Sequence, residues 1–338
     1  MGLDTPVAIA RLVIGLLLLF VGGLSLLRGS TTLARTLGIR PLVVGLTVMA
    51  YGTSAPELAV STEAAVGHLT PVALGNVIGS CAANISLILG ITALITPQVV
   101  EARIIRREAP ALLLSVVAIP LTLYDGVITR TEGLIMVGCA VVFTIVTLTV
   151  SAFSISDEDP RVTGEFRAIT GSHPATTGAH AAVGDRRSEG SRIVALVLSA
   201  LGVFLIVAGS EQFVGGARRL AGEWGISERM LGMTIVALGT SMPELLTSVV
   251  SAWKGEQRLT AGTVIGSNLL NVFLVLGLVA YLNPVRVGER MHPVDAAGLA
   301  AVTLLAVVFM RGNRKVTRIE GAILVAAYVG FIVAAALL

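Results

Sequence analysis

The chain has 338 residues, of which 54% are hydrophobic and only 13% are charged. Soluble domains carry about 25% charged residues, so this composition excludes an ordinary soluble protein and predicts an all-α integral membrane protein. The formal net charge of +3 is too small to indicate a nucleic-acid-binding surface, and the two cysteines, Cys81 and Cys139, have neither zinc-site spacing nor the number for a disulfide framework.

Ten apolar segments follow one another along the chain, and one membrane-spanning helix needs about 20 such residues. They lie near residues 7–27, 39–66, 71–97, 108–124, 131–153, 192–217, 228–253, 259–283, 292–311 and 317–338. We expect the first to be a retained helix rather than a signal peptide, because no basic run precedes it and no small-residue cleavage pattern follows it. The fourth is short and contains Pro110 and Pro120, which blur its ends.

A polar stretch rich in Ser, Thr, Gly, Asp and Arg separates the fifth segment from the sixth. It has too little apolar content to fold alone, so we interpret it as a flexible linker. The sequence therefore predicts a five-helix unit at 1–153, a linker at 154–191 and a second five-helix unit at 192–338.

The basic residues are unevenly distributed between alternate loops of this ten-helix arrangement. Of the 24 Lys and Arg residues, 17 fall on the side of the 154–191 linker and seven fall on the other side. Loops rich in Lys and Arg usually face the cytoplasm. We therefore expect a multi-pass protein with both termini outside and the linker in the cytoplasm.

The two halves contain an internal repeat. Residues 45–97 align without a gap on residues 232–284 at a constant offset of 187, with 22 identities in 53 positions. Five spans separate equivalent points, and because this number is odd the two copies should have opposite orientations in the membrane. Inverted repeats are typical of secondary transporters, which bind their substrates at the repeat interface near the middle of the bilayer.

Each repeat contains a motif that should interrupt a membrane helix, GTSAPE at 52–57 and GTSMPE at 239–244. Proline has no N–H group, so Pro56 and Pro243 each leave a carbonyl oxygen one turn earlier without its helical partner. Spacings of three and four place further oxygen-bearing groups on one face of each motif helix. These residues are Ala50, Thr53, Ser54 and Glu57 in the first copy and Ala237, Thr240, Ser241 and Glu244 in the second. The next helix of each half adds a serine and an asparagine four residues apart, Ser80 with Asn84 and Ser267 with Asn271.

The types of oxygen in these motifs indicate the chemistry. Carboxylate, carbonyl, hydroxyl and amide oxygens without His or Cys suit hard cations such as calcium or sodium. Two carboxylates about 5 Å apart at an effective dielectric constant near 20 repel each other by on the order of 3 kcal/mol. A calcium ion would cancel both charges, and so would sodium ions or protons. Competition of these ions for Glu57 and Glu244 is a physical basis for exchange.

GTSAPEL with GNVIGSCAAN, and GTSMPEL with GTVIGSNLLN, resemble the two alpha-repeats of the sodium/calcium exchanger family. The resemblance is to the compact, prokaryotic ten-helix form of this branch of the calcium/cation antiporter superfamily. It implies an antiporter of a prokaryotic plasma (inner) membrane rather than an enzyme. The implied partners are the lipid bilayer and the transported calcium and sodium ions, with no cofactor, no nucleic acid and no obligate protein partner.

The resemblance also implies roles for the motif residues. It implies that calcium binds to Glu57, Glu244 and the carbonyl groups of Thr53 and Thr240. It implies that sodium ions bind to the same carboxylates together with the motif serines and alanine carbonyls, namely Ser54, Ser241, Ser80, Ser267, Ala50 and Ala237. Asn84 and Asn271 match the positions at the middle of the cluster.

Two positions refine this comparison, and three functions remain open. Cys81 replaces the asparagine of the GSN pattern that Asn268 retains, so we expect different hydrogen bonding there. Potassium-dependent relatives carry Asp at the position of Asn271, which argues against potassium coupling. The paired hydroxyl and amide groups favour sodium/calcium exchange. The alternatives are a calcium/proton exchanger, in which protonation of the carboxylates releases calcium, and a passive cation channel with a similar oxygen cage.

Overall fold

The computed structural model describes residues 4–36, 50–102, 104–153, 184–253, 257–286, 293–312 and 314–337. Apart from four strands of two residues each, the regular elements within these ranges are helices, which confirms the predicted all-α class. The helices before the linker are α1 (Asp4–Thr36), α3 (Ala50–Thr53), α4 (Ala55–Val66), α5 (Thr70–Ala82), α6 (Leu89–Ile95), α7 (Ala109–Thr122) and α8 (Arg130–Phe153). Two π-helical stretches, η2 (Ala83–Ile88) and η3 (Ile104–Glu108), join them.

The second half repeats this order of elements. Its helices are α10 (Gly184–Trp224), α11 (Glu228–Leu231), α12 (Ala237–Thr240), α13 (Met242–Trp253), α14 (Gln257–Leu270), α15 (Gly277–Leu282), α16 (Pro293–Arg311) and α17 (Arg318–Leu337). The π-helical stretches are η4 (Gly232–Val236) and η5 (Asn271–Leu276). The strands of the whole chain are β1 (Gln98–Val99), β2 (Val127–Ile128), β3 (Val285–Arg286) and β4 (Lys315–Val316).

Seven helical stretches of the described chain are long and apolar enough to cross a membrane, and a bent pair, 228–240 with 242–253, makes an eighth candidate. They correspond to eight of the ten predicted segments. The predicted second segment begins within 37–49, which lies outside the described residues, and ends in α3 and α4. The fourth corresponds to α7, whose 14 residues are too few for a span on their own. Most of the predicted linker, 154–183, also lies outside the described residues.

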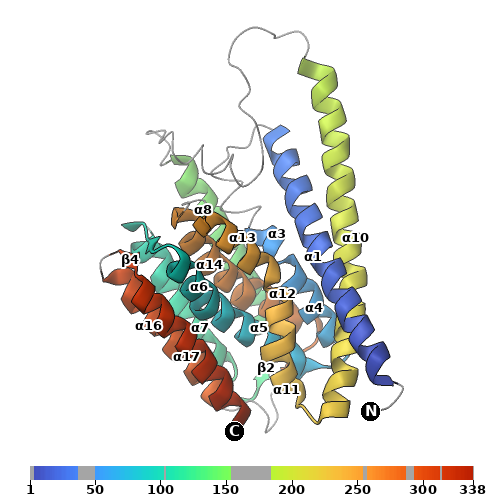
Figure 1. Ribbon diagram of the computed structural model, residues 1–338, viewed down its shortest axis with the longest axis vertical. Helices are drawn as coiled ribbons and strands as arrows, with labels where there is room; N and C mark the ends of the chain where they lie inside the picture. The colour runs from blue at the N-terminus through green and yellow to red at the C-terminus, as the bar shows by residue number, and fades with distance from the viewer. Residues whose placement is uncertain are drawn as a thin grey trace.

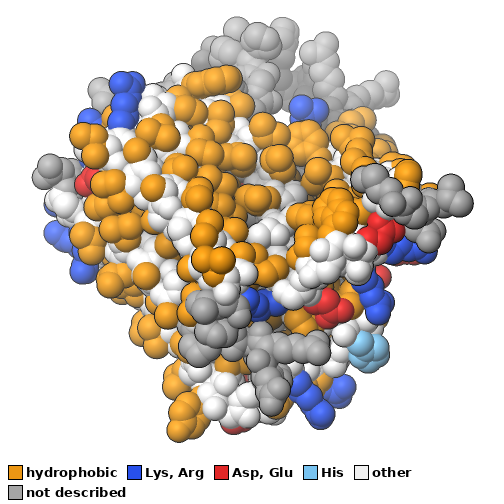
Figure 2. Space-filling model, turned by 60° about the horizontal axis from the view of Figure 1, so that its bottom comes forward, with side chains coloured by type: hydrophobic (Ala, Val, Ile, Leu, Met, Phe, Trp, Pro, Cys, Tyr) orange, Lys and Arg blue, Asp and Glu red, His pale blue; other side chains and the backbone are white. Residues whose placement is uncertain are grey.

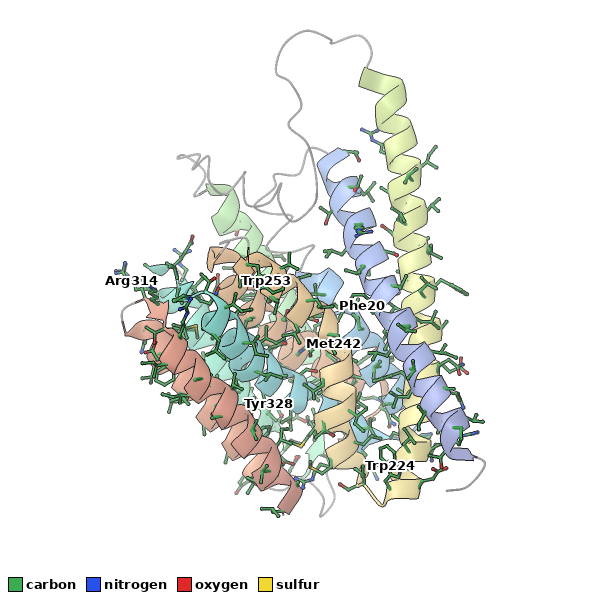
Figure 3. All side chains as sticks on the ribbon, in the orientation of Figure 1. Phe20, Trp224, Met242, Trp253, Arg314 and Tyr328 are labelled. Atoms are coloured by element: carbon green, nitrogen blue, oxygen red, sulfur yellow. The ribbon has the colours of Figure 1, made fainter. Side chains whose placement is uncertain are left out.

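The surface of the helical bundle is strongly apolar (Figure 2), and large side chains such as Leu114, Leu121 and Phe204 are exposed on it. Proteins in water rarely expose contiguous apolar patches larger than a few hundred Å². Trp224 and Trp253 are exposed towards opposite ends of the molecule (Figure 3). This arrangement fits a membrane protein, because tryptophan is enriched at both membrane–water interfaces.

Helices α1 and α10 run antiparallel, side by side, along one flank of the bundle (Figure 1). Each has a glycine at every seventh position of the contact, and the six are Gly15, Gly22, Gly29, Gly202, Gly209 and Gly216. A Cβ atom at Gly22 would lie 2.9 Å from the carbonyl oxygen of Gly202, and a Cβ atom at Gly202 would lie 2.8 Å from that of Gly22. Small residues let helix backbones approach this closely in membranes. The two helices therefore form a tightly packed pair.

Contacts between the two halves occur twice, with the halves exchanging roles. Strand β1 pairs with β4, and β3, which lies 187 residues after β1, pairs with β2. The Thr96 hydroxyl donates to the carbonyl oxygen of Ala252 at 3.1 Å. Asn283, 187 residues after Thr96, donates from its amide to the carbonyl oxygen of Ala65 at 2.8 Å. The offset read from the sequence thus relates contacts as well as residue types.

The centre of the bundle is formed by the two helices that follow the motifs. The spans Thr70–Ile95 and Ala261–Leu282 are 78% and 72% buried, whereas the other five long spans are between 17% and 39% buried. The two central spans meet at Cys81 and Asn268, where the Asn268 amide donates to the Cys81 carbonyl oxygen at 3.1 Å. One retained asparagine therefore links the two positions at which the motif copies differ.

Candidate cation site

Both motifs break their helices at the same serine. Ser54 separates α3 from α4, and Ser241 separates α12 from α13. Their backbone angles are nearly identical, φ −81° and ψ 1° at Ser54 and φ −81° and ψ 7° at Ser241. The second break bends the helix pair by 47°. Met242, the residue after this break, lies roughly midway along the molecule (Figure 3), so the motif is positioned deep within the bundle.

The two glutamates lie in the first turns of the helices that follow the breaks. Glu57 of α4 is 1% exposed and Glu244 of α13 is 2% exposed. The partial positive charge at a helix N-terminus favours a carboxylate at this position. The Ser241 hydroxyl donates to Glu57 Oε1 at 3.0 Å, and the Glu244 carboxylate faces the hydroxyl groups of Thr53 and Ser54. Each acidic side chain therefore faces the motif of the other half.

The serine and asparagine side chains of the central helices are completely buried. Asn84 and Asn271 lie at the start of the π-helical stretches η2 and η5. Helix α4 packs on η5 and helix α13 packs on η2, so each glutamate helix meets the asparagine segment of the other half. Such π-helical turns are frequent at functional sites, and the sequence did not predict them.

The alanines of the predicted set lie against the same central helices. A Cβ atom at Gly79 would lie 2.7 Å from the Ala237 Cβ atom, and one at Gly266 would lie 3.8 Å from the Ala50 Cβ atom. The Ala50 and Ala237 carbonyl oxygens accept backbone hydrogen bonds from Ser54 at 3.1 Å and Ser241 at 3.0 Å. A carbonyl oxygen has a second lone pair. None of the twelve predicted residues is more than 4% exposed.

Six of the predicted residues carry buried polar atoms without a hydrogen-bond partner in the described part of the chain. These atoms are Ser54 Oγ, Glu57 Oε2, both amide atoms of Asn84, both carboxylate atoms of Glu244, Ser267 Oγ and both amide atoms of Asn271. Buried polar groups are normally paired, and an unpaired one costs about 1–3 kcal/mol. Hard cations prefer oxygen ligands, so this concentration of unpaired oxygens fits a cation substrate.

The charges of the cluster are also uncompensated. The salt bridge found in the described ranges joins Arg229 to Asp295 at 2.6 Å, and neither Glu57 nor Glu244 has a basic partner there. No group of three or more His, Cys, Asp or Glu side chains in the described part of the chain is arranged to hold a metal ion. The cluster is instead a carboxylate pair surrounded by neutral oxygens. Two buried anions without a counter-charge are costly, which favours the binding of cations or protons.

Asn76 of α5 is a further buried side chain at this cluster, and it is not among the predicted residues. Its Oδ1 atom accepts hydrogen bonds from Thr240 Oγ1 at 3.2 Å and from Ser80 Oγ at 3.5 Å. In the sequence, its only signal is a mismatch inside an otherwise repeated segment, because Thr263 occupies the equivalent position. A comparison of identities between the two copies passes over such a position.

The chain matches known membrane proteins over nearly its whole length. Residues 7–149 and 194–337 each match the family model described as sodium/calcium exchanger protein. The inner membrane protein YrbG of Escherichia coli is 32% identical over 332 residues, which cover 98% of this chain and 96% of YrbG. Sodium/calcium exchanger MaX1 of Methanosarcina acetivorans is 32% identical over 340 residues, which cover 95% of this chain and 96% of MaX1.

Solved structures give the same result. The sodium-calcium exchanger NCX_Mj, soaked with 10 mM Na⁺ and zero Ca²⁺, matches with a TM-score of 0.65 at 27% identity, and the match covers 97% of this chain and 99% of that one. The fold and these matches define a multi-pass membrane antiporter for cations, rather than an enzyme or a passive channel. The chain belongs to the sodium/calcium exchanger protein family, which confirms the resemblance found in its paired motifs.

Proposed function

We propose that the protein exchanges sodium for calcium by alternating access at the cluster around Glu57 and Glu244, with sodium entry driving calcium extrusion. The observation that carries this proposal is the concentration of buried, unpartnered oxygens around two uncompensated carboxylates. Each ion can neutralise the same charges, so the two ions would compete. The names of the relatives MaX1 and NCX_Mj support the choice of sodium and calcium.

The proposed architecture is two inverted five-helix repeats, at 1–153 and 192–338, joined by the 154–191 linker. The duplicated family match and the reciprocal contacts at an offset of 187 support it. The Asp4 end of α1 and the Leu337 end of α17 lie at the same end of the molecule (Figure 1), as expected for an even number of crossings. The excess of basic residues on the linker side supports a cytoplasmic linker and external termini.

The ligand roles follow the types of oxygen. Calcium would bind to the two carboxylates and to the carbonyl groups of Thr53 and Thr240. Sodium ions would use the same carboxylates with the motif serines and alanine carbonyls, which are buried around them. The pair α1–α10 would move as one unit against the central helices. Gly23 of α1 lies over both motif prolines, since its Cβ atom would be 3.6 Å from Pro56 and 3.8 Å from Pro243, so sliding of this pair would change access to both breaks.

A calcium/proton exchanger on the same fold is the second candidate, because protons could neutralise the two buried carboxylates as sodium ions do. The many neutral oxygens favour sodium, because a proton needs only the carboxylate itself whereas a sodium ion needs a shell of oxygens. The two candidates therefore differ in which gradient drives calcium movement.

The experiment that separates them measures calcium uptake into proteoliposomes under one imposed gradient at a time. We expect an outward sodium gradient to accumulate calcium above its external concentration, while outward potassium and proton gradients give the background level of protein-free vesicles. Accumulation driven by a proton gradient without sodium would replace the proposal with the second candidate. Calcium movement that only follows its own gradient would indicate a channel.

A further inference from the structure

Asn76 connects side chains of both halves at the centre of the molecule. It is completely buried, and its Oδ1 atom accepts from Thr240 of the second half and from Ser80 of the first. Its Nδ2 atom donates to Ser61 Oγ at 2.9 Å, which fixes the orientation of the amide. Asn76 therefore presents an acceptor to two hydroxyl groups of the proposed sodium ligands and their neighbours.

The other half has no equivalent of this amide. Thr263 stands 187 residues after Asn76 and has a shorter side chain with a hydroxyl group. Thr53, the equivalent of Thr240, has only the Ala50 carbonyl oxygen as a hydrogen-bond acceptor, at 3.4 Å. Ser267, the equivalent of Ser80, has a hydroxyl group without a partner. The two halves of the cluster therefore differ in how their hydroxyl protons are held.

This difference changes which oxygen lone pairs are available to a cation. A hydroxyl group has one proton to donate. The Thr240 hydroxyl lies 3.2 Å from Asn76 Oδ1 and also 3.2 Å from the Ala237 carbonyl oxygen. When Thr240 donates to Asn76, the Ala237 carbonyl keeps a lone pair for a cation. When Ser80 donates to Asn76, its own oxygen lone pairs are likewise left for a cation.

Ala237 and Ser80 are close enough to act on one ion, because a Cβ atom at Gly79, the residue before Ser80, would touch the Ala237 Cβ atom at 2.7 Å. We propose that Asn76 is a positioning residue that makes the half containing Ala237 and Ser80 the tighter sodium subsite. This inference rests on the proposed function. Calcium would use the carboxylates and threonine carbonyls instead, so Asn76 should act on sodium more than on calcium.

The test exchanges the two residues between the halves of the full-length protein. We expect Asn76→Thr to raise the sodium concentration for half-maximal thermal stabilisation in detergent about 3- to 10-fold, the effect of one lost hydrogen bond. The corresponding calcium concentration should change less than about twofold on the same physical ground. Thr263→Asn alone should lower the sodium concentration, and the double exchange should bring it back towards the wild-type value.

Choline chloride at matched ionic strength controls for general salt effects. Equal shifts for sodium and calcium in Asn76→Thr, or an unchanged sodium response in both single variants, would overturn the inference and leave sodium-driven calcium flux intact. A wild-type protein that calcium stabilises but sodium does not would overturn both the inference and the sodium part of the proposed function. If Asn76→Thr does not fold, the direction of the shift in Thr263→Asn decides.

Discussion

Replacing Glu57 with Gln is expected to reduce sodium-gradient-driven calcium flux in proteoliposomes about 100-fold or more, and Glu244→Gln should do the same. Gln has nearly the same shape as Glu but no charge. Each variant would leave a single carboxylate to compensate a divalent cation, in a region where both side chains are at most 2% exposed. The measurement is initial calcium uptake per reconstituted protein.

Glu63→Gln is the matched control, because Glu63 lies on the same helix as Glu57 but outside the cluster, and it should retain uptake within about twofold of wild type. Without ions, Glu57→Gln should unfold at the same temperature as wild type or higher, because it removes charge repulsion from a buried pair. Full uptake in both glutamate variants would contradict the site assignment. Loss of uptake together with a lower unfolding temperature would instead indicate damage to the fold.

Gly22→Ala is expected to destabilise the protein by about 1–3 kcal/mol, although Ala is normally the better residue within a helix. The added methyl group would lie 2.9 Å from the Gly202 carbonyl oxygen and would force α1 and α10 apart. Gly222→Ala on α10 is the matched control, because no atom lies within 4 Å of a Cβ atom at that position. It should leave stability unchanged or increase it.

The measurement for this pair is the midpoint of thermal unfolding in detergent, with the same ion concentrations for each variant. The account requires opposite signs for the two substitutions, since one meets backbone atoms and the other meets open space. Equal midpoints for Gly22→Ala and wild type would mean that α1 and α10 are less tightly packed than the structure indicates.

The sequence predicted the class of fold and the residues of the cluster because both leave strong local signals. Polar groups are rare in apolar segments, and Glu57 and Glu244 repeat with their neighbours at a fixed offset. The structure gathers these residues in one buried region, and their roles as ion ligands remain a prediction.

Other features could not be predicted because they depend on which helices meet. The sevenfold spacing of Gly15 and Gly22 is visible in the sequence, but the facing backbone of α10 is not. Asn76 differs from its counterpart Thr263, so a search for identities gives it no weight although it joins the two halves. The π-helical stretches beginning at Ala83 and Asn271 depend on packing around the cluster rather than on local propensity.

The central claim is that calcium and sodium compete for one site formed by Glu57 and Glu244. The most direct test is equilibrium binding of radioactive calcium to the purified protein at increasing sodium concentration, with choline replacing sodium at constant ionic strength. We expect sodium to raise the calcium concentration for half-saturation without changing the amount bound at saturation, and we expect Glu57→Gln to lose this binding. Calcium binding that is indifferent to sodium, or that persists with wild-type affinity in Glu57→Gln, would contradict the account.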